Sequence, residues 1–342
     1  MAEQIKSTSG FMTVAEGAKV YADFRAEVTK AGILKRTYFY YILHVTAVFY
    51  GLGFSHFSIA TTDSLVLTFI WSIVVAFFMV QFGGLMHDAG HAAIAKTTKA
   101  NDFLGHIFSI CIAMSYHQWK TQHNEHHAHT NEAEEDPDLD VPLLSFTKER
   151  YLQKKGIGRF LAQYQAYLYY PMGSLLAFSY RIHHFFTLVS RFSIKTSWEM
   201  TLFLVAIVFW FFVPFFVFPI DKALVFFFTM HLASGLYILH IFAPNHKGMP
   251  ELAPGVKLSF LEQQIVTSRN VIGHPVLDQF YMGLNYQIEH HLFPATPRIN
   301  LPRLSMHVQA LCRKLNLEYT LCTPIESDQI ILRELAEIAR SK

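Results

Sequence analysis

Histidines dominate the residues of this sequence that could carry out chemistry. Of 19 histidines, seven fall in three short clusters. The clusters read His-Asp-Ala-Gly-His, His-Asn-Glu-His-His and Gln-Ile-Glu-His-His, and their histidines are His87, His91, His123, His126, His127, His290 and His291. On a helix, residues four apart, or three and four apart, project from one face. Each cluster therefore offers two or three imidazoles in one direction, and such donors bind first-row transition metals.

The number and kind of these side chains narrow the metal site. One pair of histidines on a helix is usually incidental, and one cluster alone could be structural or a zinc or copper site. Thiolates and carboxylates are absent from the histidine positions, which disfavours iron–sulfur clusters and soluble carboxylate-bridged di-iron sites. Seven histidines exceed the needs of one ion, so the three clusters together predict two metal ions.

Four apolar stretches must position these clusters. Of the 342 residues 52% are hydrophobic and 16% are charged, whereas soluble domains carry roughly 25% charged residues. Crossing a bilayer takes about 20 helical residues. We place the four membrane spans at Thr37–Phe57, Ser64–Phe82, Trp198–Ile220 and Lys222–Ala243. They form two hairpins, and we expect Pro214 to kink the third span.

Two further apolar stretches do not fit a span. Phe103–Tyr116 is too short to cross a bilayer. Tyr164–Phe186 is rich in tyrosine and is interrupted by Pro171 and Gly173, which suits a segment lying at the membrane interface.

Charge predicts the orientation of the spans. Of 28 Lys and Arg residues, six precede the first span, eleven lie between the second and third, and ten follow the fourth. Only Lys222 falls in a turn on the far side. Positive residues remain on the cytoplasmic side, so we expect both termini and all three clusters to be cytosolic. A net charge of +2 argues against a nucleic-acid partner.

We therefore predict an all-α integral membrane protein, with four transmembrane helices and a cytosolic helical cap that holds the histidine-rich site. The expected division is a cytosolic segment at 1–36, a membrane domain at 37–310 and a C-terminal helical cap at 311–342. Residues 1–36 contain no apolar stretch typical of a cleavable signal peptide. The three scattered cysteines indicate a reducing compartment rather than a disulfide framework.

The three clusters, in this order around two hairpins, resemble the histidine boxes of the membrane fatty acid desaturases. The resemblance covers roughly residues 35–310 and extends to the sequence around the boxes. The supporting stretches are Trp119-Lys120, Thr130-Asn131, Asp136-Pro137-Asp138, Asn285-Tyr286-Gln287 and Leu292-Phe293-Pro294. Gln287 in place of a histidine is similar to the front-end branch and its bacterial relatives. The segment Phe242–Pro250 resembles the bacterial acyl desaturases in particular.

The resemblance implies that the seven box histidines are iron ligands. It also implies a ligand just after the last span, for which we take His246, beside Asn245, with His240 as the alternative. Gln287 would ligate weakly or hold a metal-bound water. Asp88 and Glu289 lie between ligands, where they would accept an imidazole N–H or simply be solvated. We expect the remaining histidines, His44, His106, His117, His129, His231 and His274 among them, to be packed or exposed rather than ligands.

The implied reaction is the oxygen-dependent desaturation of a fatty acyl chain by two non-haem iron ions, forming a cis double bond. The acyl carrier is CoA, a carrier protein or a glycerolipid. Many front-end desaturases carry a fused haem domain, but here the first histidine, His44, already lies in a span. We therefore expect a separate electron donor, such as ferredoxin or a haem or flavin reductase system. The bacterial resemblance places the chain in a bacterial inner membrane.

Two other functions fit part of the pattern. A hydroxylase, acetylenase or carotenoid oxygenase could use the same scaffold, since the oxygen can rebind to the first carbon radical. The Gln-type third box and the Asn-His-Lys-Gly-Met-Pro segment favour a desaturase. A histidine-rich metal transporter would place ionisable residues along a path through the spans, whereas these clusters lie outside them.

Overall fold

A computed structural model describes residues 4–139, 144–194 and 196–341 of the chain. The described residues form two compact units, and each is built from separate parts of the sequence. Unit 1 comprises 1–35, 122–169 and 241–342, and unit 2 comprises 36–121 and 170–240. Residues 1–3 and 342 of the predicted terminal segments lie outside the described residues. The division at residues 36 and 310 remains a prediction.

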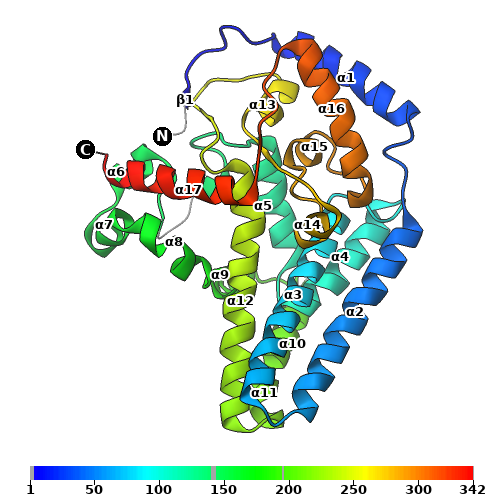
Figure 1. Ribbon diagram of the computed structural model, residues 1–342, viewed down its shortest axis with the longest axis vertical. Coiled ribbons are helices and arrows are strands. Elements are labelled where there is room, and N and C mark those ends of the chain that lie inside the picture. The colour runs from blue at the N-terminus through cyan, green and yellow to red at the C-terminus, as the bar shows by residue number, and fades with distance from the viewer. Residues whose placement is uncertain (1–3, 140–143, 195, 342) are drawn as a thin grey trace. The chain divides into compact units, whose positions relative to one another are not determined.

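Unit 2 contains the apolar helices (Figure 1). Four stretches of the described chain are long and apolar enough to cross a membrane: Tyr38–Thr61, Leu65–Gly90, Ser197–Val217 and Ile220–His246. The first two are α2 and α3, and the fourth is α12, whose last six residues belong to unit 1. The third is made of α10 (Ser197–Ile207), a π-helical segment η2 (Val208–Phe212) and α11 (Val213–Val217). The four predicted spans and the all-α class are thereby confirmed.

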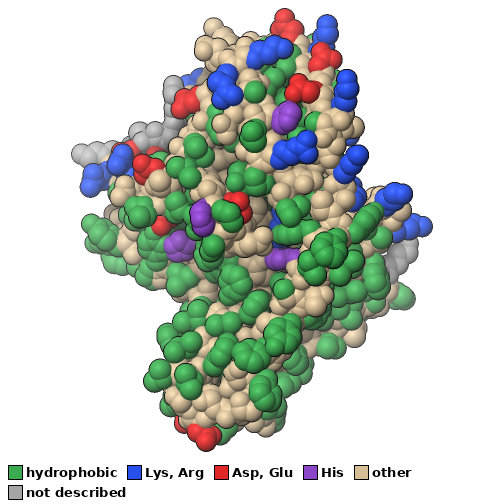
Figure 2. Space-filling view, turned by 45° about the vertical axis from the view of Figure 1, so that its right-hand side comes forward, with side chains coloured by type: hydrophobic (Ala, Val, Ile, Leu, Met, Phe, Trp, Pro, Cys, Tyr) green, Lys and Arg blue, Asp and Glu red, His purple; other side chains and the backbone are tan. Residues whose placement is uncertain are grey.

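The spans expose apolar side chains and bury small polar ones. Phe39, Tyr50 and Phe216 are more than two-thirds exposed, while Ser55 and Ser72 are buried. Figure 2 shows hydrophobic side chains over the surface of the spans, with few Lys or Arg among them. This pattern fits helices whose outer surface meets lipid and whose serines bond to their own helix, as Ser72 does to the carbonyl of Thr68.

The ends of all four spans differ from the prediction. The first span continues to Thr61 rather than Phe57, and the third ends at Val217 rather than Ile220. The second continues to Gly90 rather than Phe82, and the fourth to His246 rather than Ala243. The Gly83-Gly84 pair does not end α3, because α3 packs along both α2 and α4 (Thr98–Ile112). At the predicted kink, the π-helical segment directly precedes Pro214, which lacks the N–H needed for a regular ladder.

The two hairpin turns are linked by Lys222, the third residue of α12. Lys222 donates from Nζ to the carbonyl oxygen of Thr62, 2.6 Å away, and lies over the Phe218 ring. Thr62 follows the first span and Lys222 begins the fourth, so both turns lie at one end of unit 2. The hairpin arrangement expected from the sequence is therefore present.

The rest of unit 2 is made of shorter helices. α4 ends at Ala113, which has a positive φ of 53°. The predicted non-spanning stretch Phe103–Tyr116 thus forms most of α4 and is not a candidate span. The stretch predicted to lie at the interface forms α8 (Gln165–Gly173), which begins in unit 1, and α9 (Leu176–Ser190). On α9, Ile182 and Phe186 are exposed while Arg181 and His184 are buried.

Unit 1 holds a helical core. The buried residues of α1 (Val14–Lys30), α13 (Phe260–Val266), α15 (Gln287–Leu292) and α16 (Leu301–Leu315) form one apolar cluster. The remaining elements are β1 (Gln4–Ile5), η1 (Pro137–Leu139), α6 (Lys148–Gln153), α7 (Gly156–Gln163), β2 (Glu251–Leu252), β3 (Asn270–Val271), α14 (Pro275–Phe280), η3 (Arg298–Asn300), β4 (Leu321–Cys322) and α17 (Pro324–Ala339). α5 (Tyr116–Ala128) begins in unit 2 and ends in unit 1.

Short parallel strand pairs fasten the core helices of unit 1. Gln4 pairs with Glu251 across β1 and β2, and Asn270 pairs with Leu321 across β3 and β4. The second pair matters for the third histidine cluster, because Asn270 also bonds to α15. Its side-chain oxygen accepts the Ile288 N–H at 2.9 Å. The C-terminal segment is thus tied to the helix that carries His290 and His291.

Candidate metal centre

Three histidines from distant parts of the sequence meet in the interior of unit 1. They are His126 on α5, His246 at the end of α12 and His291 on α15, and one ring nitrogen of each lies within 4.8 Å of the others. Their ring centroids are 4.7 to 5.1 Å apart. All three are buried. We call these residues the buried trio.

Gln287 supplies a fourth polar group beside the buried trio. Its side-chain nitrogen lies 2.8 Å from Nε2 of His246 and 2.9 Å from Nε2 of His291. Its oxygen accepts a hydrogen bond from Asn245 at 3.1 Å. Asn245 therefore holds Gln287 in place, and Gln287 occupies the position next to the two imidazole nitrogens.

The opposite nitrogen of each ring in the buried trio is held by an acceptor. Nδ1 of His126 lies 3.0 Å from the Asp136 carboxylate. Nδ1 of His246 lies 3.2 Å from the Thr267 carbonyl oxygen. Nδ1 of His291 lies 2.8 Å from Oε1 of Gln264. Such outer acceptors fix the tautomer and direct Nε2 to a common centre.

Burial and charge act differently on the rings of the trio. Burial alone would lower the pKa of His126, but the carboxylates of Asp136 and Asp138 outweigh it and raise that pKa. Burial likewise works against ionisation of Asp136, but His126 outweighs it and holds the pKa of Asp136 at about 2. Burial lowers the pKa of His291 well below its usual value, and the neighbouring histidines lower it further. A neutral His291 is the form that can bind a metal.

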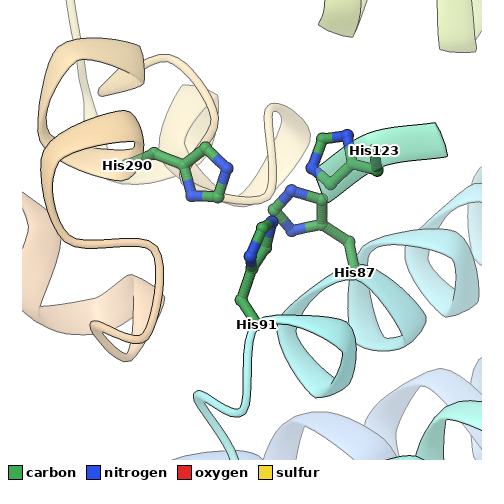
Figure 3. A group of neighbouring side chains, drawn as sticks. All are labelled: His87, His91, His123 and His290. Carbon is green, nitrogen blue, oxygen red and sulfur yellow. The ribbon is translucent and has the colours of Figure 1, made fainter. Parts of the chain in front are cut away.

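A second group of histidines lies beside the buried trio within unit 1. Nε2 of His127 is 3.2 Å from Nε2 of His123 and 3.1 Å from Nε2 of His290. The ring of His127 also stacks on that of His291, with centroids 4.1 Å apart. His123, His127 and His290, the outer trio, therefore present three imidazole nitrogens to one small volume. Figure 3 shows His123 and His290 directed toward each other from α5 and α15.

The first histidine box lies at the end of α3 in unit 2. His87 is in the last turn and His91 follows the final residue, so both rings project from one end of the helix (Figure 3). Their centroids are 4.7 Å apart. Gly90 allows a close approach here, since an added Cβ would lie 2.6 Å from the Trp119 ring. Box one therefore belongs to the helix rather than to a loop after it.

The acidic residues between the box histidines differ in their partners, since only Asp88 contacts an imidazole. Asp88 accepts from the Tyr41 hydroxyl at 2.7 Å, whereas His87 Nδ1 is 3.5 Å away, at the limit of a hydrogen bond. Glu289 accepts from Asn270 at 2.6 Å and from Tyr319 at 2.9 Å, rather than from an imidazole. Burial raises the pKa of Glu289 to about 7, although both of these donors act to lower it.

The two alternatives for the ligand near the last span are separated by the structure. His246 belongs to the buried trio. His240 instead bonds through Nδ1 to the carbonyl oxygen of Leu236, at 2.8 Å, and stacks on Tyr170. His246 is the last residue of α12 rather than part of a loop. The acceptors Thr267 and Gln264 carried no sequence signal, whereas Asp136 stood within a motif of the desaturase resemblance.

Histidines expected to be outside the site have packing roles or exposed partners. His44 stacks on Tyr40, and His106 lies between the rings of Tyr116 and Trp198. His231 is enclosed by phenylalanine rings. His129 lies 2.9 Å from Glu135 and 3.3 Å from Glu132. This last group could hold a cation, but an ion pair at the surface explains it equally well.

Comparison with known proteins identifies the family. The sequence model described as "Fatty acid desaturase" matches residues 63–323. The chain belongs to the fatty acid desaturase family. The match includes all eight of the histidines His87, His91, His123, His126, His127, His246, His290 and His291. It confirms the resemblance inferred from the boxes, and the desaturase fold and enzyme class with it.

Curated relatives of this desaturase cover most of its length. It is 29% identical to the Delta(8)-fatty-acid desaturase of Euglena gracilis, over 96% of this chain and 80% of that protein. It is 27% identical to the acyl-lipid (9-3)-desaturase of Borago officinalis, over 96% and 76%. It is 30% identical to the acyl-lipid (8-3)-desaturase of Thraustochytrium sp, over 87% and 69%. These relatives are eukaryotic, so they support the desaturase family and leave the bacterial inner membrane a prediction.

Proposed function

We propose that this enzyme uses two non-haem iron ions and dioxygen to introduce a cis double bond into a fatty acyl chain. The observation that carries this proposal is the buried trio, in which three imidazole nitrogens converge beside Gln287. The overall reaction would convert two adjacent methylene groups, dioxygen, two electrons and two protons into a carbon–carbon double bond and two water molecules. Bound iron would supply the strong oxidant that a methylene C–H bond requires, which no side-chain base can provide.

The donor set fits such a metal. The buried trio and the outer trio are made of imidazoles only, a ligand type that suits iron among the first-row metals. We propose the six histidines of the two trios as ligands, with Gln287 as a weak ligand or the holder of a metal-bound water. His87 and His91 are proposed as further ligands, on the basis of box one in the family. Eight histidines exceed the coordination sphere of one ion, which supports two.

The protein's own residues would orient and protect this centre. Asp136, the Thr267 carbonyl and Gln264 fix the rings of the buried trio, and the burial of these rings keeps bulk water away. Fixed ligands in a dry site are what an oxidising metal centre needs from its protein. We further propose a separate electron donor, such as ferredoxin or a haem or flavin reductase system. The proposed location is a membrane whose cytosolic face carries the active site.

Metal and product analysis test the proposal together. Protein produced in iron-rich medium should contain close to two iron ions per chain, and one ion with full activity would contradict the di-iron site. Zinc binds nitrogen sites more tightly than ferrous iron, so zinc content is measured in the same sample. Expression in a host of known lipid composition should yield acyl chains with a new double bond. Hydroxylated chains instead would indicate the hydroxylase alternative.

A pair of variants in α12 tests the ligand assignment. His246→Ala should abolish activity and lower the iron content, since loss of an outer partner alone costs about 10- to 100-fold. His240→Ala lies on the same helix and should keep both its iron and measurable activity, because its ring bonds within the helix. Loss of iron in His240→Ala but not in His246→Ala would reverse the assignment.

A further inference from the structure

One face of unit 1 exposes large apolar side chains on two short helices. On α6 Leu152 is 46% exposed, and on α7 Ile157 is 74% and Phe160 54% exposed. Tyr164, which ends α7, is 48% exposed. We call these four residues the α6–α7 face. Apolar side chains gathered on neighbouring turns usually mark a surface that meets another apolar phase.

The opposite side of the same helices is firmly attached to unit 1. Tyr151 and Ala162 are buried in a cluster with Ile338 of α17. The Tyr151 hydroxyl donates to the Ala339 carbonyl oxygen at 2.6 Å, and the Arg159 guanidinium lies 3.5 Å above the Tyr151 ring. Because these contacts fix the inner side, the α6–α7 face cannot turn inward without breaking them.

Basic residues are frequent in the sequence of the α6–α7 face. Residues 148–159 contain five Lys or Arg and one acid, Glu149. Arg150 and Arg159 are turned toward main-chain carbonyls of unit 1. Lys148 and Lys154 are half-buried and Lys155 is exposed. By comparison, α14 exposes Val276 but contains no basic residue.

The chain leads from this face into the membrane-spanning unit. α8 follows α7 directly, and its Tyr167 is 84% exposed. Tyrosine gathers where a protein meets the membrane–water boundary. Apolar residues flanked by lysines are also the pattern of helices that lie in an anionic membrane surface.

We propose that the α6–α7 face binds the surface of the bilayer in which the enzyme is embedded, with Lys148, Lys154 and Lys155 contacting anionic lipid head groups. The apolar residues enter the boundary between head groups and acyl chains, while the lysines remain at head-group level. The bilayer is favoured over a protein partner because it is present wherever the spans insert, and because the chain runs from this face through α8 and α9 to the third span. This inference requires only a membrane protein and does not depend on the proposed reaction.

Spin labels at two matched positions test the proposal. Ile157→Cys lies on the α6–α7 face, and Met306→Cys is an equally exposed apolar position on α16, beside Arg303. Both variants also carry Cys111→Ser, because Cys111 is only partly buried and could be labelled as well. Cys312 and Cys322 are buried and are left unchanged. In lipid nanodiscs the label at 157 should collide several-fold more with oxygen than with a water-soluble nickel chelate. The label at 306 should show the opposite preference.

Lipid composition and charge test the proposed contact between the lysines and the lipid head groups. Adding phosphatidylglycerol to phosphatidylcholine nanodiscs should move the label at 157 deeper, and Lys148→Gln/Lys154→Gln/Lys155→Gln should abolish that shift. The control Lys30→Gln/Arg313→Gln/Lys314→Gln changes three other exposed cations of unit 1 and should retain it. Free access of the nickel chelate to position 157 would overturn the proposal and point to a face reserved for a protein partner. If phosphatidylglycerol does not change the depth of the label at 157, the proposed contact between the lysines and anionic head groups is wrong.

Discussion

Each imidazole of the buried trio is oriented by a different acceptor, and only one of the three acceptors is charged. The carboxylate of Asp136 holds His126, whereas His246 and His291 are held by a main-chain carbonyl and a neutral amide. A carboxylate makes an imidazole a stronger donor toward a metal than a neutral acceptor does. His126 should therefore be the most basic ligand of the three.

The first prediction follows from this difference. Asp136→Asn keeps an oxygen beside His126 but removes the charge, so we expect a fall of about 10- to 100-fold in iron affinity or activity. Asp138→Asn is the matched control, because its carboxylate is 3.6 Å from the same nitrogen and 44% exposed. Iron content and turnover are measured for both variants. Equal losses in the two would show that nearby negative charge, not the contact with Asp136, is what matters.

Glu289 gives a prediction for the pH dependence of the metal-free protein. Its pKa in the folded protein is about 7, above the value of about 4.3 in an unfolded chain. The folded state therefore binds the proton more tightly, and this contribution to stability is complete below about pH 4 and is lost as the pH rises through 7. Wild-type protein should lose thermal stability between about pH 4 and 7 relative to Glu289→Gln. A constant difference between the two melting temperatures would contradict this.

At the scale of single residues, the sequence was informative about ligands and poor about their supports. Imidazoles at helical spacing indicate a metal site, and five of the six histidines in the two trios stand in the boxes. The sixth, His246, was proposed from the family resemblance with His240 as the alternative. The Thr267 carbonyl carries no side-chain signal, and Gln264 lies 27 residues from the histidine it contacts. Glu289 was expected to contact an imidazole or to be solvated, because it is adjacent to His290 in sequence. It does neither, since a helix turns adjacent residues to different sides and Glu289 is buried against Asn270 and Tyr319.

Among the secondary-structure elements, the end of α12 determines whether His246 can reach the buried trio. Pro244 lies two residues from the end and lacks the N–H of a regular helical hydrogen bond. Arg269 caps this end by donating to the carbonyls of Pro244, at 2.5 Å, and Lys247, at 2.7 Å. A cation placed on the last carbonyls of a helix also interacts favourably with its dipole.

The third prediction tests whether Arg269 stabilises the end of α12. Arg269→Gln should lower the thermal stability and the iron content together, since removing a charged donor from buried carbonyls costs about 1–3 kcal/mol. Arg269 also donates to Ser327 of α17 at 3.1 Å, so the variant should loosen the C-terminal helix. Arg303→Gln is the control, because Arg303 is exposed and has one bond, to the Ala31 carbonyl. If Arg269→Gln loses thermal stability but keeps its full iron content, Arg269 stabilises the fold without helping to position His246.

For the whole molecule, composition and apolar run length predicted the number of spans, because a bilayer imposes a narrow range of helix lengths. Composition and run length do not predict the division into two units, each built from separate parts of the sequence. Unit 1 combines residues from three parts of the chain, and only contacts between distant residues, such as the pairing of Asn270 with Leu321, reveal it. The expected cap at 311–342 contains α17, but its contacts extend to α6 and α7.

The charge distribution gives the last prediction, which concerns the sidedness of the membrane. The hairpin turn at Thr61 and the segment after box two, at Glu134, should lie on opposite sides, because 27 of the 28 basic residues avoid the turns. Both positions are exposed, so Thr61→Cys and Glu134→Cys can be labelled in a Cys111→Ser background. A membrane-impermeant maleimide should label position 61 in intact cells and position 134 only after permeabilisation. Labelling of both from outside would show that α4 crosses the membrane after α3, and the cytosolic placement of the active site would then be wrong.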